Sequence, residues 1–379
     1  MSKEVYKKLI VVFLVLFMFG FVLEGVTGIN NIPVLSSLIA LGLSIFLICK
    51  MKNIYAFKVV DGLIFIFLTY LIWLSLINNN FNITILVIVG AIFPYFIART
   101  IVWNGELEKI MLYTINIIAW IVIINLVILF LQNDGGTRVG IENTNHIAVG
   151  EMLGMFSIAN LYGGRGNKIK SVNIFNYIIG IISCLILINA RGAVLSIIIV
   201  TLFITVLNSR DKLKWIVYIS LIICAYLFFI REGSFIVKTF PGVERFAWNN
   251  IINDPTMIGS THYNEGRLQL YIRSFEIFLN NPIIGGGLMS VYSHNIFLET
   301  LSTVGIIGFF ILVPTIFIVV NYSIKLLKNN NVIAALFIFS LVYRQSSFAF
   351  NSHKSLFIFM GLVVSYYYVK GKNMLEAIY

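Results

Sequence analysis

Successive apolar runs, most of them nearly long enough to cross a lipid bilayer, follow one another along the chain with short polar breaks between them. They cover residues 9–23, 33–49, 59–77, 83–99, 110–131, 146–162, 173–190, 192–208, 214–230, 294–320, 332–350 and 354–369. A helix needs about 20 apolar residues to cross the hydrocarbon core. Because 59% of the residues are hydrophobic and only 11% are charged, against roughly 25% charged in soluble domains, we predict an all-α integral membrane protein.

The sequence has no internal repeat and no low-complexity linker, so we predict one polytopic membrane domain over residues 1–379 with about twelve transmembrane helices. The first apolar run is not followed by a small-x-small cleavage pattern, and we expect it to stay as the first helix. A net charge of +11 would suggest a nucleic-acid partner for a soluble protein. In a membrane protein the distribution of the charge along the chain matters more than its sum, and no nucleic-acid partner is expected.

Lysine and arginine in short loops set the orientation of membrane helices, with the positive loops inside. Of the 27 basic residues, 18 fall in alternate loops and at both ends of the chain. Those residues are Lys3, Lys7, Lys8, Lys50, Lys52, Lys58, Arg99, Lys109, Arg165, Lys168, Lys170, Arg210, Lys212, Lys214, Lys325, Lys328, Lys370 and Lys372. Both termini are therefore predicted to be cytoplasmic.

The nine remaining basic residues map to the outer side, and seven of them are arginine. They are Arg138, Arg191, Arg231, Lys238, Arg245, Arg267, Arg273, Arg344 and Lys354. Topology does not distinguish arginine from lysine, but the planar guanidinium grips phosphate through two parallel hydrogen bonds. This excess favours anion recognition outside; arginines that snorkel to lipid headgroups are the alternative. All four histidines also map to the outer side.

One outward loop is long, residues 231–293. Within it, Leu268, Tyr271, Phe275, Phe278 and Leu279 share one helical face, and polar residues share the other. This pattern predicts an amphipathic helix in the membrane interface, ended by Pro282. Gly285-Gly286-Gly287 follows, and a flexible turn explains this triple glycine as well as a functional motif does.

Two further outward features carry polar residues. A loop contains Arg138, Asn143, Asn145 and His146, and the break Asn189-Ala-Arg191-Gly192 separates two apolar runs with no room for a real loop. An arginine at or inside the membrane surface is costly unless it has a partner, which makes Arg191 a functional candidate. A plain turn cation is the alternative.

These pieces together resemble the O-antigen ligase and polymerase superfamily. The resemblance rests on Arg191-Gly192-Ala193 opening a helix, Gly266-Arg267, Asn281-Pro282-Ile-Ile-Gly285-Gly-Gly287, and His294-Asn295-x-x-Leu298-Glu299 with Gly305 and Gly308. The loop from Arg138 to Asn145 is similar to an Arg-x-x-Gly…Asn-Pro-Asn pattern of the family, with Thr144 in place of proline. The resemblance spans about residues 135–310.

The resemblance implies a bacterial glycosyltransferase of the inner (plasma) membrane that joins sugar chains at the outer face. Its donor is a glycan carried on a polyprenyl (undecaprenyl) diphosphate. A polymerase passes the growing chain to the sugar of another lipid-linked repeat unit of an O-antigen or capsule, whereas a ligase passes it to the lipid core of lipopolysaccharide. A chain-length regulator is a further partner of such polymerases.

The site that the resemblance implies needs an anion clamp and a base. Arg191 and Arg267 would bind the diphosphate and stabilise its charge as the glycosidic bond breaks. His294 would take the proton from the acceptor hydroxyl, for which an ordinary histidine pKa of about 6.5 is suited. The helix dipole there disfavours the imidazolium form; a structural His294 that caps its helix is the alternative. Other predicted substrate-binding residues are Arg138, Asn143, Asn145, Arg273, Asn295, Glu299 and Arg344.

No cofactor and no metal are expected, because the outward aspartates Asp134 and Asp254 stand apart from each other. Direct displacement at the anomeric carbon would invert its configuration. A flippase or solute transporter is the competing class. Transporters usually carry polar or charged residues near the bilayer midplane on broken helices, whereas these apolar runs are nearly free of central charge.

Overall fold

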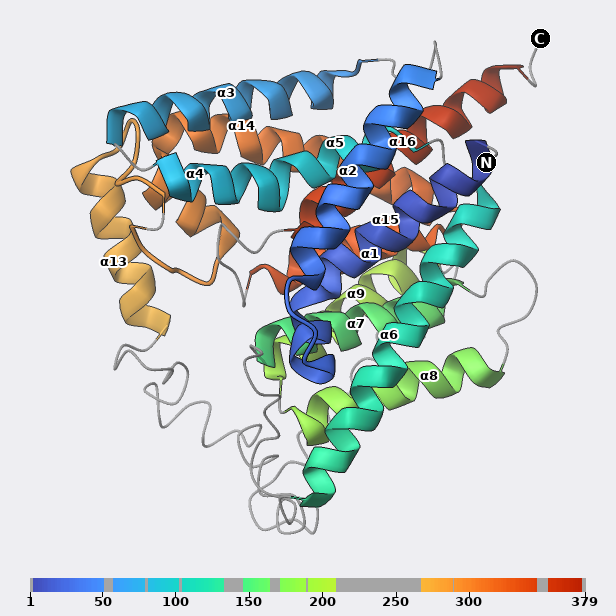
Figure 1. The fold of residues 1–379 in the computed structure, drawn as a ribbon. Helices are drawn as coiled ribbons and strands as arrows, with labels where there is room; N and C mark the ends of the chain where they lie inside the picture. Colours follow the sequence, from blue (N-terminus) through green and yellow to red (C-terminus); the bar gives the residue numbers. More distant parts are fainter. Residues whose placement is uncertain are drawn as a thin grey trace. The chain divides into compact units, whose positions relative to one another are not determined.

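The structure is a computed structural model that describes residues 3–50, 57–78, 81–101, 104–132, 146–163, 171–188, 190–208, 267–288, 290–345 and 354–376 (Figure 1). Within these ranges every regular element is a helix. Four of the helices are long and apolar enough to cross a membrane, namely α1 (Lys3–Thr27), α3 (Val59–Asn78), α6 (Gly105–Gln132) and α14 (Ile296–Leu327). The chain is therefore a multi-pass helical membrane protein; the number of crossings stays a prediction.

The remaining helices are shorter and mostly apolar. They are α2 (Ile32–Lys50), α4 (Phe81–Val87), η1 (Ile88–Ile92), α5 (Phe93–Arg99), α7 (His146–Gly163), α8 (Ser171–Ile182), η2 (Ser183–Leu187), α9 (Arg191–Asn208), α13 (Arg267–Asn280), α15 (Val332–Tyr343) and α16 (Lys354–Glu376). Each predicted apolar run except 214–230, which lies outside the described residues, coincides with one helix or with helices that follow directly on one another. The positions of those helices were therefore predicted correctly.

Two predicted runs differ in detail from the helices. Residues 83–99 were predicted as one span, but the π-helical turn η1 separates α4 from α5. Pro94 follows it, and a proline inside a helix has no N–H to donate and crowds the preceding turn, which the wider π turn relieves. In the run 332–350, α15 ends at Tyr343 with Arg344 as its C-cap, and residues 346–350 lie outside the described residues.

The chain forms two compact units. The first contains residues Met1–Gly20, Asn31–Thr114 and Gln269–Tyr379. In it α14 packs along α3, and α16 packs against α5 and α15 (Figure 1). Gly361 of α16 lies so close to α5 that a Cβ there would stand 2.5 Å from the Tyr95 carbonyl oxygen. Small residues allow such close helix contacts in membranes, where packing replaces the hydrophobic effect.

The second unit contains residues Phe21–Asn30 and Ile115–Leu268. Its helix α7 packs against α8 and α9, and residues Val149–Asn160 of α7 are buried. The Trp120 ring of α6 meets Phe156 of α7 edge-on and stacks on Phe175 of α8. A helix that is apolar on all sides and buried in a bundle is the expected outcome of such a sequence. The prediction of a single membrane domain stays a prediction.

Candidate functional site

Helix α14 is broken at Gly305, whose φ of 66° and ψ of −169° are not helical. In an unbroken helix the carbonyls of Ser302 and Thr303 would accept from the N–H groups four residues later. Here they accept instead from Gly286 N at 2.8 Å and Gly287 N at 3.0 Å. The break therefore exchanges bonds within the helix for bonds to the glycine-rich segment.

The backbone N–H groups that follow the break also find acceptors in this segment. Ile306 N donates to Pro282 O at 2.9 Å and Ile307 N donates to Ile283 O at 3.4 Å. The Tyr70 hydroxyl of α3 donates to Val304 O at 2.7 Å. Backbone polar groups inside a membrane protein need internal partners because hydrocarbon offers none, and this segment provides them.

Gly285 and Gly305 lie so close together that neither position has room for a side chain. A Cβ on Gly305 would stand 2.3 Å from Ile283 O and 2.6 Å from Gly285 N, and a Cβ on Gly285 would stand 2.6 Å from Gly305 N. Both residues also have positive φ, where side chains are strained. The alternative of a merely flexible turn at residues 285–287 is wrong, because the backbone of this segment is hydrogen-bonded to α14.

His294 lies directly before the N-cap of α14, at the end of the chain that returns from the glycine segment. Its φ is 59° and only 9% of its surface is exposed. Its ring centroid lies 4.0 Å from that of Tyr292, with the planes tilted by 59°. The predicted helix N-terminus at His294 is confirmed. The alternative that His294 caps the helix is wrong, because Asn295 is the cap.

Asn295 caps α14 through its side-chain oxygen, which accepts from Phe297 N at 3.0 Å and Leu298 N at 3.1 Å. Its amide nitrogen donates to the side-chain oxygen of Gln345, at 3.2 Å. Ser293 adds a hydrogen bond from its hydroxyl to Asn295 O at 3.0 Å. Asn295 therefore fixes the turn that carries His294, and its predicted contact with substrate stays a prediction.

Glu299 follows this turn in the chain, Arg344 is joined to it by a backbone hydrogen bond, and both residues are buried at 2% exposure. Glu299 N donates to Asn295 O at 2.9 Å, within the first turn of α14. The Arg344 carbonyl accepts from Ile296 N at 3.2 Å, and its guanidinium donates to Ser355 Oγ of α16 at 2.9 Å. The burial places Arg344 between helices.

Arg191 belongs to the second unit, where it is the first residue of α9. The chain reverses immediately before it. The π turn η2 ends at Leu187, and Ala190 N donates back to Cys184 O at 2.9 Å. This tight reversal confirms the predicted break without a loop and places an arginine at a helix N-terminus, whose dipole attracts anions.

The other predicted residues are distributed as follows. Arg138, Asn143 and Asn145 lie outside the described residues. Arg267 is the first residue of α13, and Arg273 is exposed on that helix. The structure thus brings His294, Asn295, Glu299 and Arg344 together in the first unit, and it places Arg191 in the second.

Helix α13 is confirmed as a helix that ends before Pro282. Of the side chains that the structure describes on this helix, Ser274 is the most buried at 1% exposure. Ile272, Phe275 and Leu279 are exposed beside the charged Arg273 and Glu276. The predicted interfacial location of α13 stays a prediction.

Sequence reasoning missed a buried ion pair near the predicted cytoplasmic side. Arg99 of α5 donates twice to Asp61 of α3, from Nε at 2.8 Å and Nη2 at 2.9 Å, and the Tyr95 hydroxyl donates to the same carboxylate at 2.6 Å. Asp61 has no exposed surface. Arg99 was interpreted only as a loop cation, although an aspartate inside an apolar run was a signal that it needed a partner.

A buried chain of asparagines was also missed. In the second unit Asn160 Nδ2 donates to Asn116 Oδ1 at 2.7 Å, and Asn176 Nδ2 donates to Asn160 Oδ1 at 3.0 Å. These bonds join α6, α7 and α8. Amide side chains are common links between membrane helices.

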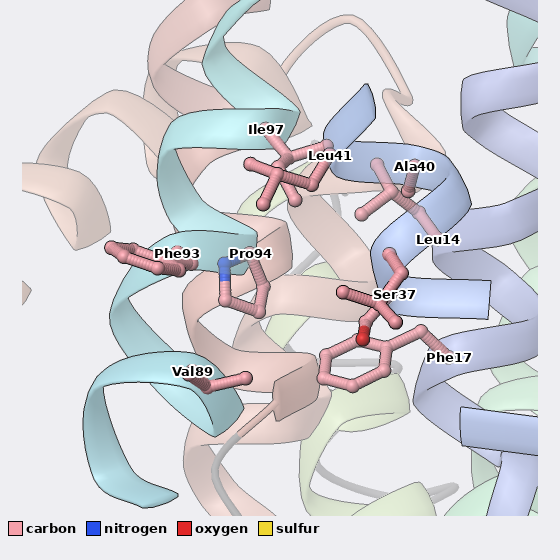
Figure 2. Close-up of a pocket in the computed structure, with 10 residues that line it drawn as sticks. Leu14, Phe17, Ser37, Ala40, Leu41, Val89, Phe93, Pro94 and Ile97 are labelled. Atoms are coloured by element: carbon pink, nitrogen blue, oxygen red, sulfur yellow. The ribbon is translucent and has the colours of Figure 1, made fainter. Parts of the chain in front are cut away.

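An apolar pocket of about 170 Å³ opens between α1, α2 and η1–α5 in the first unit (Figure 2). Leu14, Phe17, Leu41, Val89 and Pro94 line it. Its polar lining residue is Ser37, whose hydroxyl donates to Val34 O of its own helix at 2.8 Å. The pocket suits a hydrocarbon chain and offers no group for chemistry, so the candidate site is elsewhere.

The fold and the His294 region define a multi-pass membrane protein with a capped and broken helix next to a buried histidine. Residues 177–313 match the model of the O-antigen ligase family, which confirms the resemblance of the chain to the O-antigen ligase and polymerase superfamily over that stretch. The matched range contains Arg191, Arg267 and His294, and also residues 282–287 with the break in α14 at Gly305 to which they are hydrogen-bonded. No curated protein matches the chain.

Proposed function

We propose that this chain is a glycosyltransferase that polymerises a bacterial surface polysaccharide of the O-antigen or capsule type. It transfers a glycan from polyprenyl diphosphate to the sugar hydroxyl of another lipid-linked repeat unit. The reaction is metal-independent and inverts the anomeric centre. It takes place at the outer face of the inner (plasma) membrane, with both termini in the cytoplasm and a chain-length regulator as a partner.

The setting of His294 carries this proposal. The residue is held beside a helix N-terminus by a separate cap, Asn295, so its imidazole is not used for capping. It is buried and in contact with an aromatic ring, which limits water at the reacting hydroxyl. The N-terminal end of a helix dipole favours neutral imidazole over imidazolium, and neutral imidazole is the form that accepts a proton.

In the proposed step His294 takes the proton of the acceptor hydroxyl while the hydroxyl oxygen attacks the anomeric carbon. The bond from that carbon to the diphosphate oxygen breaks, and the diphosphate leaves with the electron pair. Arg191 and Arg267 neutralise the leaving charge. The proton stays on His294 until solvent removes it, so no co-reactant is needed.

A ligase that uses the same residues is the second candidate, favoured by the description of the matching family as O-antigen ligase. The two differ only in the acceptor. A lipid flippase or a solute transporter is the candidate from another class, and it would form no new glycosidic bond.

The test reconstitutes the purified protein in liposomes with lipid-linked repeat units and analyses glycan length. Longer glycans show a polymerase. Transfer that requires an added lipid-core acceptor shows a ligase. Movement of the lipid across the bilayer with no new linkage shows a flippase and contradicts the proposal.

The same assay tests the base. His294→Ala should reduce product formation by roughly 10²–10⁴-fold, the usual contribution of a general base, while binding of the donor lipid is nearly unchanged. His353→Ala, outside every family pattern, is the matched control and should stay active. Full activity of His294→Ala would exclude this histidine as the base.

The arginine clamp is tested by Arg191→Lys and Arg267→Lys. Lysine keeps the charge but loses the planar fork, so both variants should lose most activity. Arg245→Lys is the control, because Arg245 has the same predicted outward location but belongs to no family pattern. Equal loss at Arg245 and Arg267 would indicate a diffuse basic surface.

A further inference from the structure

Two elements far apart in the sequence meet at the turn that carries His294. The C-terminal end of α15 contributes Arg344 and Gln345, and the N-terminal end of α14 contributes Asn295 and Ile296. Ile296 N donates to Arg344 O at 3.2 Å, and Asn295 Nδ2 donates to Gln345 Oε1 at 3.2 Å and to Gln345 O at 3.5 Å.

Gln345 is itself held in place. Its Nε2 donates to Leu341 O at 3.1 Å, one turn back in α15. Its backbone N donates to Val342 O at 3.1 Å. These bonds orient the side-chain amide so that Oε1 faces Asn295.

Asn295 thus makes two separable sets of bonds. The side-chain oxygen caps α14, and the side-chain nitrogen reaches across to α15. Serine is as good an N-cap as asparagine, yet it has no amide nitrogen and is too short to replace this bond. Capping of α14 therefore does not by itself require the contact with Gln345.

We propose that Gln345 is a positioning residue, which acts through Asn295 to hold His294 where it can accept the proton of the acceptor hydroxyl. The inference rests on the proposed role of His294 as the base. Gln345 touches neither substrate nor the reacting atoms. It fixes the amide of the cap, and the cap fixes the left-handed backbone of His294, at φ 59°.

The bond matters because His294 stands in a conformation that side chains seldom adopt and that its surroundings have to impose. Without the side-chain bond to Gln345 the turn loses one of the bonds that join it to α15, and His294 can relax towards ordinary backbone angles. A reacting group that moves by about 1 Å can lose about 100-fold in rate. The loss is expected in kcat, since the proposed diphosphate ligands Arg191 and Arg267 belong to other elements, α9 and α13.

The test compares Gln345→Met, which keeps the length and removes the acceptor, with Gln345→Glu, which keeps an acceptor oxygen. Gln345→Met should reduce kcat by about 10- to 100-fold with the donor KM unchanged, and Gln345→Glu should recover most of the rate. Asn295→Ser removes the bond to Gln345 Oε1 and also the longer bond to Gln345 O, so it should reduce kcat at least as much as Gln345→Met. The double variant should be no worse than Asn295→Ser alone, since that change already removes the bond that Gln345→Met removes.

A second measurement does not depend on any enzymatic activity. Diethyl pyrocarbonate modifies accessible imidazoles, and mass spectrometry follows His294 and, as an internal reference, His146. His294 should react several-fold faster in Gln345→Met and in Asn295→Ser, whereas His146 should react at the wild-type rate.

The outcomes are distinct. Losses that multiply in the double variant, an effect of Gln345→Met on KM alone, no rescue by Gln345→Glu, or an unchanged His294 reactivity would each overturn the positioning role. If wild-type protein forms no glycan, the proposed function fails instead. The modification rate then decides whether Gln345 holds the histidine, and an unchanged rate in Gln345→Met overturns the inference on its own.

Discussion

Replacing Gly305 with alanine tests the interlock between the glycine segment and the break in α14. The new Cβ would lie 2.3 Å from Ile283 O and 2.6 Å from Gly285 N, both backbone atoms, so the segment has to move away. At φ 66° and ψ −169°, a region that essentially only glycine adopts, the backbone alone costs an alanine about 1–3 kcal/mol. Displacement would also weaken the bonds from Gly286, Gly287 and Ile306 across the break, each of which contributes about 1 kcal/mol.

We therefore expect Gly305→Ala to lower the free energy of unfolding by about 2–5 kcal/mol. The chain offers two matched controls. Gly28 has φ of 69° and nothing within 4 Å of an added Cβ, so Gly28→Ala should show only the conformational cost. Gly42 has open space and no positive φ, so Gly42→Ala should stay within about 0.5 kcal/mol of wild type or gain slightly from helix propensity.

The assay is unfolding of the detergent-solubilised protein by increasing SDS, followed by tryptophan fluorescence. Activity in the reconstituted system should fall with Gly305→Ala, because the interlock fixes the chain on both sides of His294. The reasoning is refuted if Gly305→Ala is no less stable than Gly28→Ala, since the steric clash would then cost nothing.

Three further predictions follow from the ion pair, the absence of an acidic cluster in the outward sequence and the loop charges. Asp61→Leu should destabilise the protein by about 3–5 kcal/mol because it leaves Arg99 buried without its carboxylate, and Asp61→Leu/Arg99→Leu should recover part of that loss in the same SDS titration; equal loss in both would contradict the pairing. Polymerisation should survive EDTA, whereas loss that Mg²⁺ or Mn²⁺ restores would contradict the arginine clamp. A reporter fused after Gly242 should behave as external and one after Lys168 as cytoplasmic, and the reverse at either site would overturn the orientation.

Much of the helical layout was predictable because it depends on local information. The apolar run 59–77 became α3 (Val59–Asn78) almost residue for residue, since hydropathy and helix length are properties of one stretch of chain. The start of α14 was also predictable, because Asn295 is a typical capping residue. The turn at Arg191 was predictable from the lack of residues for a loop.

What the sequence could not predict depends on partners that lie far away along the chain. The break at Gly305 depends on Pro282–Gly287, and the Asn295 amide depends on Gln345, 50 residues later. Periodicity carries no information on which distant carbonyl replaces a helix bond. Arg99 was similarly predicted only as a cation of a cytoplasmic loop, because its partner, Asp61, lies 38 residues earlier on another helix.

The hydrogen bonds across the break in α14 have a consequence for how the gene can change in length. A backbone hydrogen bond joins Gly286 and Ser302, so the chain between them is a closed ring of fixed length with His294 on it. One inserted residue after Ser290 would lengthen this ring and displace the turn that carries His294 and Asn295 relative to the glycine segment, although surface loops usually accept insertions. The exposed turn at Asn329–Asn330 between α14 and α15 lies outside the ring from Gly286 to Ser302, and insertions there should persist among natural relatives.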